Sequence, residues 1–278
     1  MANNSPAEPQ DQEMHHASDT VHRRRVIAVG GAVAAVAGLG LAATASATPE
    51  SRAAAAARPT RSASATATAA ASSSVCSLTA EVTEGPYALE GALVRTDITE
   101  GKSGVPVEYT FTVVDEASSC APLEGALVEI WHADTLGEYS GFVGRNGHSE
   151  DDDGTFLRGG QITDSNGQAS ITSIWPGHYI SRAVHVHLRV HTDVTLTDDS
   201  YTGGEIIHTG QLFFDATINT QVQQLSPYSS NTTKETSLDD DTVYDGGGAS
   251  SGLLTLTALG SSVSDGYGAT LTIGVSAD

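Results

Sequence analysis

The sequence has few positively charged residues for its length. It contains 13 Lys and Arg against 34 Asp and Glu in 278 residues, which gives a formal net charge of −21. Residues 76–278 carry 7 of the basic and 29 of the acidic side chains. Such a surface repels the phosphates of nucleic acids and anionic lipid headgroups, so nucleic acid is excluded as a partner. The charge mainly keeps the protein soluble.

Aromatic residues are also scarce, at 5% of the chain, and no stretch has a convincing amphipathic helical pattern. Ala, Ser, Thr and Gly are abundant instead, and short apolar or alternating segments are separated by turn sequences such as residues 163–168. This pattern predicts an all-β fold, a sandwich or a barrel. The main expected strands are residues 107–114, 125–132, 184–190, 209–214, 253–258 and 269–275.

The N-terminal residues have the pattern of an export signal. Three arginines at 23–25 precede an uncharged run that ends at Pro49, and Ala45-Ser46-Ala47 is an A-x-A cleavage site. We therefore expect residues 1–47 to be a secretory signal of the twin-arginine type that leaves no membrane anchor after cleavage. The alternative is an uncleaved transmembrane anchor, although glycines and alanines make the run weakly apolar.

A linker and two cysteines follow. Residues 48–75 are predicted to be a flexible linker because they are almost entirely Ala, Ser, Thr, Arg and Pro, which leaves 76–278 as the folded domain. Cys76 and Cys120 are the only cysteines. In an exported chain they are expected to form a disulfide between the segment ahead of the first strand and a turn. Two reduced, buried thiols are the alternative.

The feature most suggestive of chemistry is the pair His185 and His187. They alternate with apolar residues, which predicts a half-buried strand. Same-face residues of a strand are about 6.5–7 Å apart, so two imidazoles can bind one metal ion. The Pro176-Gly177 turn places Tyr179 in a loop that can fold back over the pair.

Nearby tyrosines change which metal is expected. Zinc would be expected to recruit a third His, a Cys or a carboxylate. Phenolates are hard, anionic oxygen donors that favour Fe(III), which lowers the pKa of a phenol far below its free value of about 10. Two phenolates and a hydroxide neutralise Fe(III), and a catechol dianion could replace the hydroxide and one phenolate. Charge balance alone thus favours a site in which a diol displaces the hydroxide and one phenolate from the metal.

Several blocks of the sequence resemble the intradiol ring-cleavage dioxygenases, in the family's order and over about 130 residues. The resemblance implies a β-sandwich with long active-site loops and one non-haem Fe(III) per chain. The blocks are residues 84–87 (Glu-Gly-Pro-Tyr), 130–140, 156–159, 176–187 and 209–214.

The resemblance also assigns roles to individual residues. The implied iron ligands are Tyr139, Tyr179, His185 and His187. Tyr179 would be the ligand that leaves and takes a substrate proton. Arg182 and Gln211 would line the substrate side, and Arg182 would stabilise the negative charge that develops there. The turn Gly85, Pro86 and Tyr87 would wall the pocket, and His132, His178 and His208 would have supporting roles.

The implied reaction cleaves a catechol-type diol with O2 between its hydroxyl-bearing carbons, giving a muconate-type diacid. We expect no helical domain ahead of the sandwich, whereas the catechol-cleaving branch would have one. No partner subunit is visible, whereas the protocatechuate branch would need one. The chain looks closest to exported single-domain members from actinobacteria, and we expect a monomer or homodimer. Substrate choice is expected to depend on the loops at 142–156 and 192–206.

Two other classes of function remain open at this level. One is another H-x-H metalloenzyme, of cupin or copper type, with His208 as a third ligand. The other is a non-catalytic exported β-sandwich that binds a saccharide or a surface polymer.

Overall fold

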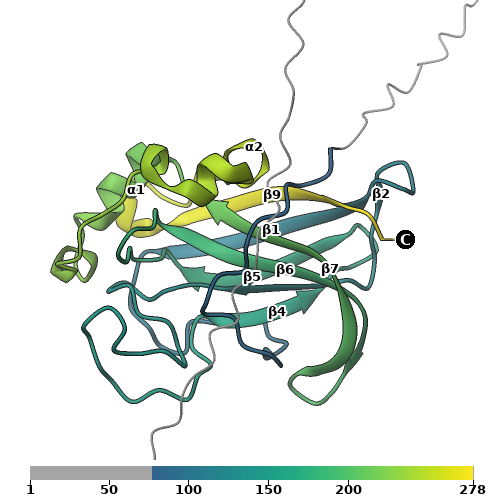
Figure 1. Cartoon of the computed structure of the whole chain (residues 1–278), viewed down its shortest axis with the longest axis horizontal. Coiled ribbons are helices and arrows are strands. Elements are labelled where there is room, and N and C mark those ends of the chain that lie inside the picture. The colour runs from purple at the N-terminus through teal and green to yellow at the C-terminus, as the bar shows by residue number, and fades with distance from the viewer. Residues whose placement is uncertain (1–76, 278) are drawn as a thin grey trace, which may run out of the picture. The chain divides into compact units, whose positions relative to one another are not determined.

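Two β-sheets pack face to face in the computed structural model, which describes residues 77–277 (Figure 1). The first sheet has the order β2-β1-β9-β8, with β5 also paired to β1, and the second has the order β4-β3-β6-β7. This arrangement confirms the predicted all-β sandwich. The strands are β1 Pro106–Asp115, β2 Ala121–Pro122, β3 Leu127–Trp131, β4 Arg158–Ile162, β5 Gln168–Ile174, β6 His185–Leu196, β7 Tyr201–Phe213, β8 Thr255–Ala258 and β9 Tyr267–Val275.

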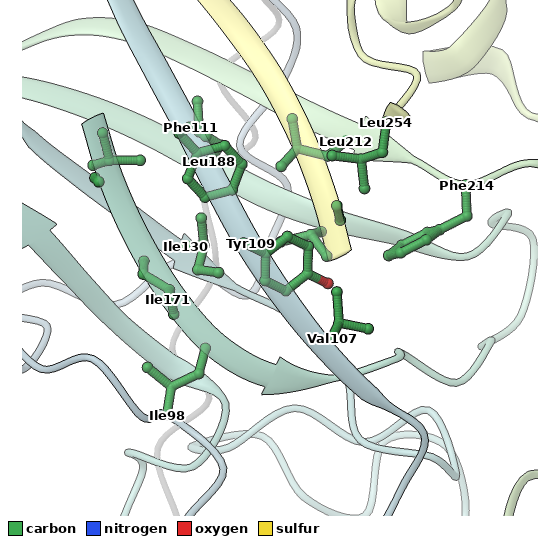
Figure 2. Packing of buried hydrophobic residues seen from close by; sticks show 14 of the residues in the cluster. Ile98, Val107, Tyr109, Phe111, Ile130, Ile171, Leu188, Leu212, Phe214 and Leu254 are labelled. Atoms are coloured by element: carbon green, nitrogen blue, oxygen red, sulfur yellow. The ribbon is translucent and has the colours of Figure 1, made fainter. Parts of the chain in front are cut away.

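Strand alternation explains the core between the sheets. Along β1 every second residue is buried, including Tyr109 and Phe111, while the residues between them face outward. Figure 2 shows these side chains together with Ile130 of β3, Leu188 of β6 and Leu212 of β7, which belong to the same core cluster. Burying each large apolar side chain stabilises the fold by about 1.5–3 kcal/mol. The core therefore holds β6 by its apolar face and leaves its histidines on the opposite face.

The helical segments lie between β7 and β9, and Figure 1 shows α1 and α2 together on one side of the strands. The sequence analysis predicted no helix, which was wrong at α1. The N-cap residue of this helix, Asp215, accepts hydrogen bonds from Thr217 N and Ile218 N. Its buried face is largely polar, including Asn219 and Gln223, so no apolar stripe marked it. The segments are α1 Ala216–Gln223, η1 Tyr228–Ser230, η2 Leu238–Asp240, η3 Tyr244–Gly248, α2 Ala249–Ser251 and η4 Val263–Asp265.

The histidine face of β6 is not open to solvent, so the predicted half-buried strand was wrong. His185, His187 and Arg189 are all fully or nearly fully buried. The segment that precedes β1 lies across this sheet: Val82 N donates to Thr209 O, and Gln211 Nε2 donates to Thr83 O. The polar side chains of β6 therefore lie between the sheet and this covering segment.

The predicted export signal (1–47), the linker (48–75) and Cys76 lie outside the described residues. Cys120 follows β1 in a turn, where its N–H donates to Asp115 O. Within residues 77–277, no helix is long and apolar enough to cross a membrane.

Candidate metal centre

Four side chains predicted to bind a metal converge at one end of β6. His185 Nε2 and His187 Nε2 are 3.1 Å apart. The Tyr139 hydroxyl lies 3.1 Å from His187 Nε2 and 3.5 Å from His185 Nε2, and the Tyr179 hydroxyl lies 3.3 Å from His185 Nε2. All four residues are buried. The structure thus brings together residues separated by up to 48 positions in the sequence.

The histidine rings are oriented by their neighbours. The ring of His185 donates through Nδ1 to Ala183 O at 2.6 Å, which leaves Nε2 as the acceptor that faces the centre. His187 pairs with Trp131 across β3 and β6, and the two rings stack with centroids 5.0 Å apart. Gly85 closes over this ring with a φ of +73°, and a Cβ there would lie 3.1 Å from His187 Cε1. This contact and the positive φ favour glycine at position 85.

Tyr139 is fixed on two sides. Tyr87 stacks on its ring with centroids 4.4 Å apart. Next along the chain, Ser140 donates to Phe156 O and accepts a hydrogen bond from Arg158 Nε at 2.7 Å. The Arg158 guanidinium also donates to Ser140 O. Tyr139 is therefore held rigidly between the covering segment and β4.

Tyr179 lies on a more exposed turn. The preceding His178 is anchored by contacts of its two ring nitrogens with Gln223 Oε1 and Thr233 O. The following Ile180 is 70% exposed, and Ser181 has a left-handed φ of +66°. Of the two tyrosines, Tyr179 is thus the one whose chain can move with less loss of packing.

Arg182 faces the same centre and is held by an acidic residue. Its Nε donates to Asp241 Oδ2 at 2.9 Å and its Nη2 to Gln211 Oε1 at 2.5 Å, while Nη1 lies 3.4 Å from His185 Nε2. Burial raises the pKa of Asp241, but hydrogen bonds from Arg182 and from the Tyr244 and Ala183 amides outweigh it, so the pKa stays below its usual value. Arg182 is therefore paired with an ionised carboxylate.

Burial keeps the four donor groups neutral in the absence of a cation. It raises the pKa of Tyr139 well above its usual value and that of Tyr179 to about 12, although Arg182 partly offsets the second shift. Burial also lowers the pKa of His185 and of His187, with further lowering by Arg182 at the first and by His185 at the second. Two phenolates at this site would need a compensating cation of high charge.

The donor set fits such an ion. Two ligands at about 2.1 Å from one metal ion and separated by about 90–110° lie about 3.0–3.4 Å apart. The observed separations of 3.1–3.5 Å fall close to this range. Two phenol oxygens and two imidazole nitrogens therefore suit one hard trivalent metal ion.

Comparisons with known proteins show the family of this chain. A sequence model for a dioxygenase family (Dioxygenase_C) matches residues 83–189. The intradiol ring-cleavage dioxygenase from Tetranychus urticae is 32% identical, with a TM-score of 0.62, over 72% of this chain and 95% of that one. This chain belongs to the intradiol ring-cleavage dioxygenases.

Two further solved structures show similarity to this dioxygenase. A second dioxygenase structure is 30% identical with a TM-score of 0.63, at the same coverage of 72% and 95%. The dioxygenase domain of a carbohydrate-binding fusion protein from Streptomyces sp. SirexAA-E is 24% identical with a TM-score of 0.47, over 73% of this chain and 100% of that one. No curated protein sequence matches.

His208 and His132 of the dioxygenase form side-chain contacts outside the four predicted ligands. His208 Nδ1 contacts Glu81 Oε1 at 2.6 Å, and His208 is paired in register with Val190 rather than with a ligand. His132 contacts Ala133 O and Ser173 Oγ. Within residues 77–277 there is no group of three or more His, Cys, Asp or Glu that could hold a metal. The structure therefore does not place His208 as a third ligand.

The predicted pocket wall lies beside the tyrosines. Tyr87 borders a cavity of about 20 Å³, roughly the space of one water molecule. A Cβ at Gly85 would meet the His187 ring, so the turn that contains Pro86 lies between the ligand strand and the cavity. The cavity is lined by Tyr87, Gly137, Tyr139, Arg145, Asn146, Tyr179 and Ile180.

Sequence reasoning missed two acidic residues near the site. Asp241 belongs to an Asp-rich stretch, residues 239–241, yet it is 1% exposed and pairs with Arg182. Glu138 is also buried, and its carboxylate accepts hydrogen bonds from the amides of Gly144, Asn146 and His148. Only its position beside Tyr139 could have drawn attention to Glu138.

Proposed function

We propose that this dioxygenase is a non-haem Fe(III) enzyme that uses O2 to cleave catechol-type diols between the two hydroxyl-bearing carbons, giving muconate-type diacids. The observation that carries the proposal is the convergence of two phenols and two imidazoles within 3.1–3.5 Å in a buried site. Tyr139, Tyr179, His185 and His187 would hold the iron. Family membership supports the intradiol class of reaction.

Tyr179 and Arg182 would have different roles, because the first lies on a more mobile turn and the second carries a permanent charge. The chemistry that Fe(III) would supply is Lewis-acid activation of a catechol bound through both of its oxygens, with electron density drawn from the ring so that the ring becomes reactive toward O2. Tyr179 would leave the centre as the diol enters, and its phenolate would take a proton from a substrate hydroxyl. Arg182, fixed by Asp241 and Gln211, directs a permanent positive charge toward negative charge on the substrate.

Purified protein tests the proposal directly. We expect about one iron per chain, a visible Fe(III)–phenolate absorption band, and O2 uptake with at least one of catechol, hydroxyquinol or protocatechuate. A colourless zinc protein would contradict the metal assignment. A semialdehyde product, formed by cleavage beside the diol, would contradict the intradiol reaction. A non-catalytic binding protein would show neither stoichiometric iron nor O2 uptake.

Replacement of each tyrosine by phenylalanine is expected to separate the two ligands. Tyr139→Phe should shift or bleach the visible band, because it removes the phenol that is packed against Tyr87 and held by the Ser140–Arg158 contacts. Tyr179→Phe should keep more of the iron but slow substrate chelation, because the proton-accepting phenolate is lost. Iron content, absorption spectra and stopped-flow mixing with catechol measure these effects. Identical behaviour of the two variants would contradict the division of roles.

We also propose that the protein is exported. The basis is the sequence pattern of arginines at 23–25, an uncharged run and the Ala45-Ser46-Ala47 site. Cell fractionation and N-terminal sequencing of the mature protein test this. A mature chain that begins shortly after Ala47 is expected, whereas a full-length chain in the membrane would favour an uncleaved anchor.

A disulfide between Cys76 and Cys120 is predicted in the exported protein. Close to Cys76 in sequence, Thr79 N donates to Gly274 O, and Gly274 pairs with Val114 near the end of β1 that leads to Cys120. Closing a loop of about 45 residues should stabilise the fold by about 4 kcal/mol in the chain-entropy model. Mass spectrometry of unreduced peptides should find the linked pair. Two free thiols in the exported chain would disprove the bond.

A further inference from the structure

Arg145 is an uncompensated cation at the cavity beside the two tyrosines. It is exposed and lines the cavity together with Tyr139 and Tyr179. Most other basic side chains of residues 77–277 form ion pairs, but no carboxylate in this part of the chain pairs with Arg145. The pairs formed by lysine and arginine are Arg95–Glu100, Lys102–Asp134, Lys102–Glu150, Arg182–Asp241, Arg189–Glu84 and Arg189–Glu90.

The backbone on both sides of Arg145 is fixed despite its exposure. The amides of Gly144 and Asn146 donate to the buried carboxylate of Glu138 at 3.0 and 2.9 Å. The Asn146 side chain donates to Leu136 O and accepts from Thr233 Oγ1. This network places Arg145 at the cavity wall, and no carboxylate among residues 77–277 pairs with its guanidinium.

An unpaired cation at this position stands out because the chain as a whole is strongly acidic. A net charge of −21 repels anions from most of the surface, and an unpaired guanidinium at the cavity offsets that repulsion locally. Guanidinium binds carboxylates through two parallel hydrogen bonds. The remaining wall is aromatic or apolar at Tyr87 and Ile180, which suits a ring with an anionic substituent.

We propose that Arg145 is a specificity-determining residue that favours catechols with a carboxylate on a ring substituent over uncharged catechols. This inference rests on the proposed ring-cleaving function and adds the charge of the preferred substrate. The ring would lie at Tyr139 and Tyr179, and the carboxylate would point along the cavity wall to the Arg145 guanidinium.

A matched pair of substrates tests the proposal: 3-(3,4-dihydroxyphenyl)propanoate and its methyl ester, which differ in charge at the substituent. In the wild type, kcat/KM should be about tenfold higher for the acid than for the ester. The corresponding free energy lies between that of an exposed ion pair and that of a hydrogen bond to a charged group. Arg145→Gln should abolish the preference, Arg145→Lys should retain part of it, and Arg145→Glu should reverse it. Higher salt should narrow the preference in the wild type.

Lys234→Gln is the control, because Lys234 is another exposed cation with no ion pair among residues 77–277 and does not line the cavity. It should keep the wild-type ratio. Anaerobic titration of the visible spectrum with each compound gives Kd values and thus a second readout that is independent of turnover. Equal ratios in the wild type and in Arg145→Gln would overturn the inference while leaving the ring-cleaving function intact. Loss of ring cleavage with every catechol in the wild type would instead refute the proposed function.

Discussion

His185→Ala and His187→Ala should each lose most of the bound iron and, with it, the visible absorption band. Each substitution removes one of four converging donor atoms, and the other three are already committed as ligands and cannot replace it. Loss of an outer-shell partner already weakens metal binding about 10–100-fold, so loss of a direct ligand should leave less than about a tenth of the iron after dialysis against a chelator. Metal analysis and absorption spectra measure this.

His191→Gln is a matched control for this experiment. His191 lies on the same strand and is also buried, but its Nε2 contacts Glu129 at 2.9 Å instead of the centre. Glutamine can still donate to Glu129, so this variant should keep its iron. Circular dichroism of all variants separates metal loss from unfolding, because His187 packs against Trp131. Full iron and full ring-cleaving activity in His185→Ala would show that the centre is assigned wrongly.

The alternation around His185 and His187 was enough to predict the strand and the face that carries the histidines. It was not enough to predict their burial. The segment that covers them contains Thr83 and Gly85, about 100 residues earlier in the sequence. No local pattern reports such a long-range contact, so the face was expected to be open to solvent.

Asp241 and Glu138 show a second limit of sequence reasoning. A carboxylate in an acidic stretch is expected to be solvated, and only the fold reveals that Arg182, 59 residues away, lies beside Asp241. Glu138 is buried because three loop amides donate to it. Helix α1 escaped prediction for a similar reason, since its buried Asn219 accepts from Trp175 Nε1 and has no apolar signature.

Arg182→Ala should keep both the iron and the visible colour but lose about 2.7–4 kcal/mol of transition-state stabilisation, by analogy with removal of an oxyanion-hole donor. Arg182 contributes no ligand atom, and its guanidinium is already oriented by Asp241 and Gln211 before substrate enters. Because the guanidinium needs no reorganisation during the reaction, its positive charge stabilises the negative charge that develops on the ring and on oxygen in the transition state. Steady-state kcat/KM should therefore fall about 10²–10³-fold.

Asp241→Asn distinguishes the charge of Arg182 from its placement. This variant keeps the size of the side chain and one acceptor oxygen but removes the negative partner, so Arg182 keeps its charge and loses its fixed orientation. We expect a smaller loss of kcat/KM than in Arg182→Ala, again with iron retained. Arg182→Lys should not restore full activity, because an ammonium cannot contact Asp241 and Gln211 with the geometry of the planar guanidinium. If Arg182→Ala instead lost iron as completely as His185→Ala, its role would be to hold His185, whose Nε2 lies 3.4 Å from Nη1, and the assignment to charge stabilisation would fall.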